Sequence, residues 1–422
     1  MNTRSTSVVV VGQGYVGLPL AMRAVQVGHR VVGYDTDVLR VQRLAKGDSY
    51  IEDVPSSDVA RALELGTYLP TGDSADCVDF DVAIITVPTP LTDGIPDLSF
   101  IVSAGQTLTP YLRRGACVVL ESTTYPGTTS ELLVPLLESS GMRAGIDFHV
   151  GYSPERIDPG NKTWTFVNTP KVVSGLTPTS LVAVQEFYDT LVDQTVAVSG
   201  VKEAELTKLL ENTFRHVNIA LVNELAMFAS DLGVDLWEAI DSASTKPYGY
   251  MRFEPGPGVG GHCLPVDPSY LSWKVKRALG SSFRFVELAN DVNDHMPHYV
   301  ANRIASALNR QQRAINGAKI LVLGLAYKRN SHDKREAPGP VLCKLLDGFG
   351  ADVRAVDPFL NDMDFPTCVT RTELSTEELE AADLVVIVTD HDAFDWDLIS
   401  RSSGSVLDTR HRLQPATNVE YL

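Results

Sequence analysis

Cysteine, basic residues and long apolar runs are all scarce in this sequence of 422 residues. The five cysteines are scattered, odd in number and never paired as Cys-x-x-Cys, which argues against a disulfide framework or a zinc site and predicts a reducing compartment. The apolar run at residues 8–11 is too short for a signal peptide or a membrane span, and no later run reaches spanning length. We therefore expect a cytoplasmic protein with neither a metal site nor a membrane partner.

The shortage of basic residues limits the partners further. Lys and Arg total 36 against 53 Asp and Glu, which gives a formal net charge of -17. Such a chain has no evident basic face that could follow a phosphate backbone, so we expect no nucleic-acid partner. An anionic ligand would have to be held locally, by helix N-termini and a few placed Lys or Arg side chains. The composition otherwise indicates a globular protein of two or three domains.

The first informative feature is a glycine motif, Gly-Gln-Gly-Tyr-Val-Gly at residues 12–17, which directly follows a β-branched run. A helical pattern and a second strand ending in Asp35 come next, as in a dinucleotide-binding unit. Gly12 would make the tight turn, Gly14 would admit a pyrophosphate to the helix N-terminus, and Gly17 would let helix pack on strand. Asp35 would accept from a ribose 2′-hydroxyl, which favours NAD over NADP. The alternative is a turn whose glycines serve packing alone.

Loops rich in hydroxyl and carboxyl groups follow further strands predicted at 81–90, 116–121 and 148–152. Open α/β sheets bind ligands at the carboxyl ends of their strands, so these loops are candidate sites. Thr123 and Glu155 lie in two of them, although Glu155 could also be a surface carboxylate. Thr128 and Thr129 are expected to cap the helix that comes after.

One long helical pattern covers residues 201–232 without Pro or Gly. Lys208 and Asn212 lie one turn apart on one of its faces. Lys208 is either a snorkelling surface lysine or, if partly buried, a base or an oxyanion partner. The helix also carries an apolar stripe, which predicts core or a subunit interface: Leu206, Leu209, Leu210, Phe214, Val217, Leu221, Leu225 and Phe228.

A glycine-rich loop at 256–261 precedes Cys263, and Asp267 follows four residues after the cysteine. Glycines lack β-carbons, so this backbone can approach a substrate closely. A thiolate there could attack a carbonyl while the carboxylate takes or holds a proton. The alternative is a small buried hydrophobe in a turn. Arg252, beside aromatic residues before the loop, could pair with a phosphate or a carboxylate, and a helix is predicted to resume at 267.

The last part of the chain begins a second strand-turn-helix unit near residue 317, with a degenerate glycine fingerprint. A basic loop follows its first strand, with Lys328, Arg329, Lys334 and Arg335. This loop suits a charged nucleotide other than NAD, or is a solvated charge cluster. We therefore predict an α/β protein with two Rossmann-like, doubly wound parallel-sheet domains, at 1–200 and 301–422. They would be joined by the long central helix and a small helical domain at 201–300.

An NAD site and a nucleophilic cysteine indicate aldehyde oxidation through a thioester, and a lysine with an aspartate indicates proton removal from an alcohol. Together they predict a two-step oxidation of a primary alcohol to an acid. In their order along the chain, the motifs resemble those of the nucleotide-sugar 6-dehydrogenase family. The matching stretches are 12–17, 122–127, 153–155, 205–212, 256–267 and 324–338.

The resemblance implies roles for these residues. Asp267 and Lys208 would assist removal of the C6 hydroxyl proton, and Cys263 would capture the aldehyde as a thiohemiacetal. A second NAD would oxidise this to a thioester, which water near Thr123, Glu155 and Asp267 would hydrolyse. The expected catalytic residues are Cys263, Lys208, Asp267, Asn212, Glu155 and Thr123. The expected NAD contacts are Gly12, Gly14, Tyr15, Val16, Gly17, Asp35, Arg40, Thr86, Pro88, Thr89, Thr123 and Arg335. The expected substrate contacts are Glu155, Arg156, Lys208, Asn212, Arg215, Arg252, Gly260 and Lys328.

The branch is indicated by a departure at 154–159. UDP-glucose enzymes usually read Pro-Glu-Phe-Leu-Arg-Glu where this chain reads Pro-Glu-Arg-Ile-Asp-Pro. With 124–129, 210–215 and 260–263, this resembles the UDP-N-acetylglucosamine and UDP-N-acetylmannosamine branch, although Ala337 stands where the family usually has Ser. We expect UDP-N-acetylglucosamine as substrate and a homodimer through the central helix, with Arg252 serving its own or a neighbouring subunit. The alternatives are a UDP-N-acetylmannosamine or UDP-glucose 6-dehydrogenase, a β-hydroxyacid dehydrogenase that needs no Cys263, or a non-catalytic nucleotide-sugar-binding protein.

Overall fold

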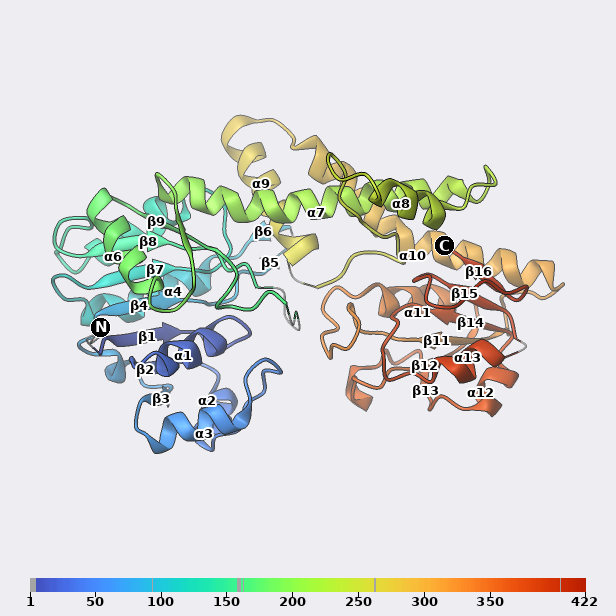
Figure 1. Ribbon diagram of the computed structural model, residues 1–422, viewed down its shortest axis with the longest axis horizontal. Coiled ribbons are helices and arrows are strands. Elements are labelled where there is room, and N and C mark those ends of the chain that lie inside the picture. The colour runs from blue at the N-terminus through green and yellow to red at the C-terminus, as the bar shows by residue number, and fades with distance from the viewer. Residues whose placement is uncertain (1–4, 93, 158–160, 162, 262, 403) are drawn as a thin grey trace. The chain divides into compact units, whose positions relative to one another are not determined.

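The computed structural model describes residues 5–92, 94–157, 161, 163–261, 263–402 and 404–422 (Figure 1). For Cys263 it describes the backbone alone. The chain divides into two compact units, Met1–Glu211 (unit 1) and Asn212–Leu422 (unit 2). The boundary falls inside helix α7 (Val201–Ala229), which therefore contributes to both units.

Unit 1 is built on an eight-stranded sheet in the order β10-β9-β8-β7-β4-β1-β2-β3. Strands β1, β2, β3, β4, β7 and β8 run parallel to one another, whereas β9 and β10 run antiparallel to them. The sequence pattern did not predict this reversal. The central strands are apolar because helices cover both faces of the sheet. The strands of the sheet are β1 (Ser7–Val11), β2 (Arg30–Tyr34), β3 (Tyr68–Thr71), β4 (Val82–Ile85), β7 (Cys117–Leu120), β8 (His149–Tyr152), β9 (Lys171–Gly175) and β10 (Thr195–Ala197), with a separate hairpin of β5 (Leu91–Thr92) and β6 (Ile95–Pro96).

Alternate residues of β1 enter the two apolar layers of unit 1. Val8 and Val10 pack in one layer, and Val9 and Val11 in the other. The first layer includes α1 (Gly17–Gln26), α2 (Val38–Ala45), α3 (Ser56–Glu64) and α6 (Pro178–Tyr188). The second includes α4 (Ser99–Leu108), α5 (Val134–Glu138) and the first turn of α7. The short helical turns are η1 (Ser74–Cys77), η2 (Thr109–Tyr111) and η3 (Thr129–Leu133).

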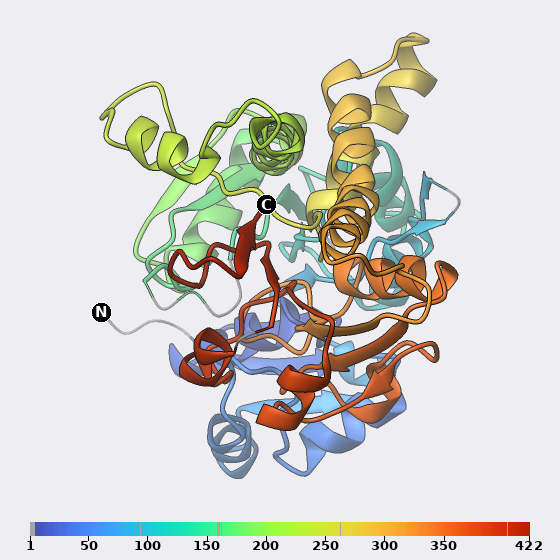
Figure 2. The same ribbon diagram turned by 90° about the vertical axis from the view of Figure 1, so that its right-hand side faces the viewer.

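Unit 2 contains a six-stranded, fully parallel sheet in the order β13-β12-β11-β14-β15-β16 (Figures 1 and 2). Helices α10 and α11 pack on one face, and α12 and α13 on the other. The strands are β11 (Lys319–Leu323), β12 (Asp352–Val356), β13 (Thr370–Arg371), β14 (Leu384–Ile387), β15 (Val406–Asp408) and β16 (Val419–Tyr421). The helices are α8 (Leu236–Ser244), α9 (Cys263–Leu279), α10 (Arg284–Arg310), α11 (Pro338–Gly348), α12 (Thr376–Ala381) and α13 (Trp396–Arg401), with the turn η4 (Asp362–Asp364).

Two helix boundaries in the structure differ from those predicted. The long helix ends at Ala229 rather than near 232. Helix α9 begins at Cys263, one turn before the predicted start, and carries Pro268 inside it. None of the helices in the described part of the chain is long and apolar enough to cross a membrane.

Candidate active site

The glycine loop of unit 1 joins β1 to α1 at the carboxyl edge of the sheet. Gly12 has a φ of +94°, and a β-carbon there would lie 2.9 Å from the carbonyl oxygen of Thr86. A β-carbon on Gly17 would lie 1.8 Å from the carbonyl oxygen of Gly12. At Gly14, by contrast, no described atom comes within 4 Å of such a β-carbon. No described side chain caps α1, whose N-cap is Val16, so the N-terminus of this helix is available to an anion.

Asp35 follows β2 at the same edge and is 6% exposed. Its Oδ2 accepts from the backbone N–H of Gln13 at 2.7 Å, and its Oδ1 from that of Asp37 at 2.8 Å. The Nη1 of Arg40 lies 3.5 Å from Oδ2. Each carboxylate oxygen has two acceptor positions, so both can take a further hydrogen bond from a vicinal diol.

Buried side chains hold the glycine loop from within, and sequence reasoning missed most of them. The Nε2 of Gln13 donates to the carbonyl of Val10 at 2.9 Å, and the Tyr68 hydroxyl donates to its Oε1 at 2.7 Å. The Tyr50 hydroxyl donates to the Gln13 carbonyl at 2.5 Å, and burial raises the pKa of both tyrosines. The predicted NAD contact Thr86 uses its hydroxyl on the carbonyl of Gly12, at 2.8 Å. The shape of the glycine loop is therefore fixed by hydrogen bonds within the protein.

The loops after β4 and β7 are tied together. The hydroxyl of Thr89 donates to the carbonyl of Thr123 at 2.9 Å. Thr89 is buried, Thr123 is half-buried and Pro88 is exposed. Because β4 and β7 are parallel neighbours, all three lie at the carboxyl edge with the glycine loop.

The predicted threonine cap of the next helix is wrong. The hydroxyl of Thr128 bonds Thr124 at 2.6 Å and caps nothing. The cap is the fully buried carboxylate of Glu205 on α7, which accepts from the Gly127 and Thr129 N–H groups at 2.6 and 2.8 Å. The Thr129 hydroxyl adds a third bond at 2.7 Å. Burial raises the pKa of Glu205, and the three hydrogen bonds oppose that shift.

Glu155 belongs to a buried charge cluster at the carboxyl end of β8. Its Oε1 accepts from the N–H groups of Arg156 and Ile157 at 2.6 and 2.5 Å. The Nζ of Lys171 lies 3.4 Å from its Oε2 and 2.7 Å from Oε1 of Glu121. Because β9 is antiparallel, Lys171 at its first residue reaches the same edge of the sheet. Glu155 is therefore held in place by the chain and is not a free surface carboxylate.

The other members of the cluster are buried as well. Glu121 and Lys171 are 1% and 4% exposed, and the Tyr188 hydroxyl donates to Glu121 at 2.6 Å. Burial raises the pKa of Glu121 despite the Lys171 charge. Burial alone would lower the pKa of Lys171, but the two carboxylates outweigh it and raise that pKa. The predicted substrate contact Arg156 instead binds Glu211 at 2.7 Å.

Replacing Lys171 by Met is expected to destabilise unit 1 by about 3–5 kcal/mol, because two buried carboxylates would lose the cation between them. Urea unfolding of the purified protein measures the change. Lys202→Met is the matched control, because Lys202 and Glu131 form an ion pair with half-exposed side chains, whose loss should barely change the stability. Equal unfolding midpoints for the two variants would contradict the assignment.

In unit 2 the backbone of Cys263 opens helix α9, and Asp267 follows one turn later on the same face. The side chain of Cys263 and all of His262 lie outside the described residues. Asp267 is fully buried, and its Oδ2 accepts from the Nδ2 of Asn212 at 2.7 Å. Asn212 and Lys208 are 4% and 7% exposed on α7, so Lys208 is not a surface lysine.

The cysteine loop, residues 256–261, packs against two other loops of unit 2. The N–H of Gly261 donates to the carbonyl of Arg335 at 2.9 Å. A β-carbon on the predicted substrate contact Gly260 would lie 2.6 Å from Cβ of Tyr327, and one on Gly256 would lie 2.6 Å from Nη1 of Arg410. Arg410 follows β15, and its Nε donates to the carbonyl of Val388 at 2.8 Å. Sequence reasoning missed Arg410, because no motif marks it.

Most of the predicted cations of unit 2 are paired within it. Arg335, predicted as an NAD contact, forms a bidentate pair with Asp333, and Arg329 pairs with Asp390. Arg252 lies between Asp241 and Glu254. The remaining predicted substrate contacts differ in exposure: Lys328 is half-buried and Arg215 is exposed.

In unit 2 a carboxylate binds the degenerate glycine loop that follows β11. Asp357 follows β12 as Asp35 follows β2, but its Oδ2 accepts from two loop amides, those of Leu325 at 2.7 Å and Ala326 at 2.9 Å. His391 adds a contact at 3.1 Å. Burial would raise the pKa of Asp357, but these partners lower it. Asp357 thus engages two amides of its loop, where Asp35 engages one amide of the glycine loop, that of Gln13.

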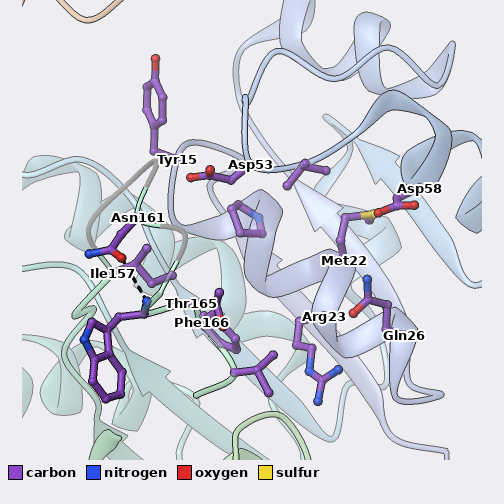
Figure 3. A pocket seen from close by; sticks show the side chains of 14 residues that line it. Tyr15, Met22, Arg23, Gln26, Asp53, Asp58, Ile157, Asn161, Thr165 and Phe166 are labelled. Carbon is purple, nitrogen blue, oxygen red and sulfur yellow. Dashed lines mark hydrogen bonds between the residues drawn. The ribbon is translucent and has the colours of Figure 1, made fainter. Parts of the chain in front are cut away.

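A cavity of about 260 Å³ lies beside α1 in unit 1 (Figure 3). Met22, Arg23 and Asp58 line it together with Asn161, whose Oδ1 accepts from the N–H of Trp164 at 3.0 Å. Among the predicted site residues, the described lining includes Tyr15 alone. This cavity therefore meets the predicted site only at Tyr15 of the glycine loop.

Comparison with known proteins identifies the family. Residues 6–192 match the model of the UDP-glucose/GDP-mannose dehydrogenase family NAD binding domain, residues 202–295 its central domain, and residues 321–415 its UDP binding domain. This chain belongs to the UDP-glucose/GDP-mannose dehydrogenase family. The predicted family, α/β fold class and NAD cofactor are thus confirmed, and the chain is an NAD-dependent nucleotide-sugar dehydrogenase.

Members of the family with similar sequences carry N-acetylhexosamine names. The UDP-N-acetyl-D-mannosamine dehydrogenase of Pyrococcus horikoshii is 36% identical over 401 residues, covering 94% of this chain and 92% of that protein. The UDP-N-acetyl-D-glucosamine 6-dehydrogenase of Pseudomonas aeruginosa is 36% identical over 396 residues, covering 93% and 92%. The solved structure of the Pyrococcus horikoshii UDP-D-ManNAc dehydrogenase has a TM-score of 0.89 at 33% identity and covers 98% of each chain.

The glycine loop of this dehydrogenase fits NAD. The open space at Gly14 and the uncapped N-terminus of α1 suit a pyrophosphate, and Asp35 retains acceptor positions for ribose hydroxyls. Gly12 to Gly17 and Asp35 would therefore hold the cofactor.

Proposed function

We propose that this dehydrogenase oxidises the C6 hydroxyl of a UDP-N-acetylhexosamine, UDP-N-acetylglucosamine in the first place, to the carboxylate. The observation that carries the proposal is the pairing of Asn212 with the fully buried Asp267, one helical turn after Cys263. A carboxylate kept from water and aimed by an amide suits proton transfer beside a nucleophile. NAD, when bound, supplies the hydride acceptor for both oxidations.

The chain's own groups would act in sequence. Asp267 and Lys208 assist removal of the single C6 hydroxyl proton, while the C6 carbon loses a hydride and the alcohol becomes an aldehyde. The thiolate of Cys263 adds to the aldehyde carbon, and Lys208 and Asn212 donate to the oxygen that becomes negative. The first residue of a helix favours an anion, which supports a thiolate at position 263. Loss of a second hydride converts the thiohemiacetal to a thioester.

Hydrolysis of the thioester returns the thiol. A water molecule adds to the thioester carbon, the carbon–sulfur bond breaks, and the sugar leaves as a carboxylate. Glu155 and Thr123, both at the carboxyl edge of the unit 1 sheet, are proposed to orient that water. Lys171 and two backbone amides fix the Glu155 carboxylate, while its Oε2 has a further acceptor position for water.

The nucleotide end is assigned to the second sheet. Lys328 follows β11 and Arg410 follows β15, so both lie at the carboxyl edge of the parallel sheet in unit 2. We propose that they contact the UDP moiety, with Gly260 in contact with the sugar. Arg215 and Arg252 stay proposed substrate contacts, and Arg335 a proposed NAD contact that would have to leave Asp333.

A panel of UDP-hexoses tests the function. The purified protein is given NAD with UDP-N-acetylglucosamine, UDP-N-acetylmannosamine or UDP-glucose, and NADH and uronic acid are measured per sugar consumed. We expect two NADH for each UDP-N-acetylglucosamine oxidised and much slower turnover of UDP-glucose. One NADH per sugar would support the simpler β-hydroxyacid dehydrogenase chemistry instead, and binding without turnover would support the non-catalytic alternative.

Replacing Asp35 by Ala is expected to lower the preference for NAD over NADP by about tenfold or more, because it removes a carboxylate that repels a 2′-phosphate. Arg40, 3.5 Å from Asp35, would then be released to bind that phosphate. The ratio of kcat/KM for the two cofactors measures the effect. Asp58→Ala on α3 serves as control, and an unchanged ratio in the Asp35 variant would refute the role.

We also propose a homodimer through α7. Leu206, Leu210, Phe214, Leu221 and Phe228 are each 42–64% exposed on this helix, whereas Leu209 from the same predicted stripe is buried. Their spacing keeps the exposed five on one narrow face. A monomeric sedimentation coefficient at micromolar concentration would contradict the dimer.

The three domains at 1–200, 201–300 and 301–422 and a cytoplasmic location stay proposals. Limited proteolysis tests the domains, with cuts expected near 200 and 300. The location is supported by free thiols at Cys77, Cys117, Cys343 and Cys368, and recovery of the protein outside the cytoplasmic cell fraction would contradict it.

A further inference from the structure

A chain of hydrogen bonds in unit 2 starts at the cysteine loop and returns to it. The backbone N–H of Gly256 donates to Oδ1 of Asn223 at 2.9 Å. The Nδ2 of Asn223 donates to Oδ1 of Asn293 on α10, also at 2.9 Å. The Nδ2 of Asn293 in turn lies 3.3 Å from Nδ1 of His216. Asn223, Asn293 and His216 are at most 3% exposed, so water does not compete for these bonds.

The second half of the chain leads back to helix α9. The Nε2 of His216 lies 2.7 Å from Oδ1 of Asn290. The Nδ2 of Asn290 donates to Oγ of Ser269 at 3.5 Å, the longest link. The Ser269 hydroxyl donates to the carbonyl of Pro265 at 3.1 Å. Gly256 and Pro265 lie on either side of Cys263, so the chain ties down both ends of the segment that carries it.

The two ends allow only one direction. A backbone N–H can only donate and a carbonyl can only accept, so every link between Gly256 and Pro265 must point the same way. Each asparagine and the serine can supply one donor and one acceptor to such a chain. His216 can do so only as the neutral ring, with its proton on Nε2 and a lone pair on Nδ1. A protonated ring brings two donors, and then some buried donor in the chain must lack an acceptor.

We propose that this set of residues, which we call the loop clamp, holds the cysteine loop in its reactive shape only while His216 is neutral. The clamp consists of His216, Asn223, Asn290, Asn293 and Ser269. They are positioning residues, since none of them need touch substrate. The proposal rests on the proposed function, in which Cys263 is the nucleophile.

The surroundings of the ring keep it neutral in this protein. Burial lowers the pKa of His216, and the bond to Asn290 only partly opposes this. The charged groups and other histidines within one helical turn of a clamp residue are Arg215 and Glu224 on α7, Asp267 on α9, and Glu287, Asp291, Asp294 and His295 on α10. All of these except Asp267 are exposed, and Asp267 is engaged by Asn212. The clamp is thus closed at neutral pH and is expected to open in acid.

The test places a carboxylate next to the imidazole ring of His216. In Asn290→Asp the charge at Nε2 favours the protonated imidazole, so acid should open the clamp at a higher pH. The carboxylate cannot donate to Ser269, so the 3.5 Å link is lost at every pH in both the single and the double variant and cancels between them. We expect kcat of this variant, relative to the unmodified enzyme, to fall about tenfold between about pH 8 and about pH 6, with KM nearly constant. The double variant Asn290→Asp/His216→Gln should lose this acid sensitivity, because glutamine supplies one donor and one acceptor and does not titrate. Asn309→Asp, exposed on the same helix, is the matched control.

A second measurement separates the clamp from the chemistry. Hydrogen exchange of the Gly256–Gly261 amides, followed without substrate, should speed up in acid in Asn290→Asp and stay slow in the double variant. If exchange behaves in this way while Cys263→Ser still makes acid, the proposed function fails, and the clamp then holds no catalytic cysteine. The pH-dependent change in the loop itself would still stand. If exchange in Asn290→Asp matches the unmodified protein at every pH, or the double variant is as acid-sensitive as the single one, the clamp is overturned. If Asn290→Asp does not fold, Asn293→Asp is the second variant: its carboxylate cannot donate to Nδ1 and favours the protonated ring, so the Gly256–Gly261 amides should exchange fast already at neutral pH.

Discussion

Cys263→Ser is expected to lower uronic acid formation at least about 10³-fold, because a serine hydroxyl is a far weaker nucleophile than a thiolate and no activating base is assigned to it. The thiol is the only group in the proposed route that holds the aldehyde for the second oxidation. The ratio of NADH to sugar should therefore fall from two toward one, with aldehyde or its hydrate as product. Both quantities are read in one experiment, NADH by absorbance and the sugar by chromatography.

The control for that experiment is Cys368→Ser, a half-buried cysteine of the same unit that no motif includes. It should keep both the rate and the ratio of two. Acid release by Cys263→Ser at the rate of the unmodified enzyme would end the thioester route and favour direct oxidation of an aldehyde hydrate.

Asp267→Asn is expected to lower kcat by about 10²–10⁴-fold, the usual effect of removing a general base or acid. The amide has the shape of the carboxylate, and its oxygen can still accept from Asn212, so the fold of unit 2 should persist. This matters because Asp267 is fully buried, and a variant without an acceptor would confound chemistry with stability. Thermal unfolding of the variant checks the fold, and steady-state kinetics checks the loss.

Asp347→Asn on the exposed side of α11 is the matched control for the charge change. A value of kcat within about twofold of the unmodified enzyme in Asp267→Asn, with the fold intact, would remove Asp267 from the mechanism. Lys208 would then be the remaining candidate for the base.

The glycine loop shows why part of the site was predictable. Gly12, Gly14, Gly17 and Asp35 belong to one strand-helix-strand unit, so their relative positions follow from local geometry. The steric reasons are visible in the structure: a β-carbon at Gly12 or Gly17 would collide with backbone, and Gly14 borders open space. The same holds for the Cys263 to Asp267 spacing, which is a single helical turn.

Other assignments depended on partners far away in sequence. Thr129 looked like a helix cap, but Glu205, 76 residues later, supplies the capping carboxylate. Lys171 carries no motif and matters only because reversed strand β9 brings it between Glu121 and Glu155.

By itself, the sequence determined the α/β class, the NAD loop and the spacing of Cys263 and Asp267, because each depends on one or two neighbouring elements. It also determined the family, because the order of motifs along the whole chain is a property of the sequence. Only the tertiary structure decided which polar groups are buried and which of them meet: the pairing of Asn212 with Asp267, the charge cluster around Lys171, and the ring of hydrogen bonds through His216. The physical reason is that the strength of a polar contact is set by burial and by its partner. Both are properties of side chains that folding brings together from distant parts of the chain.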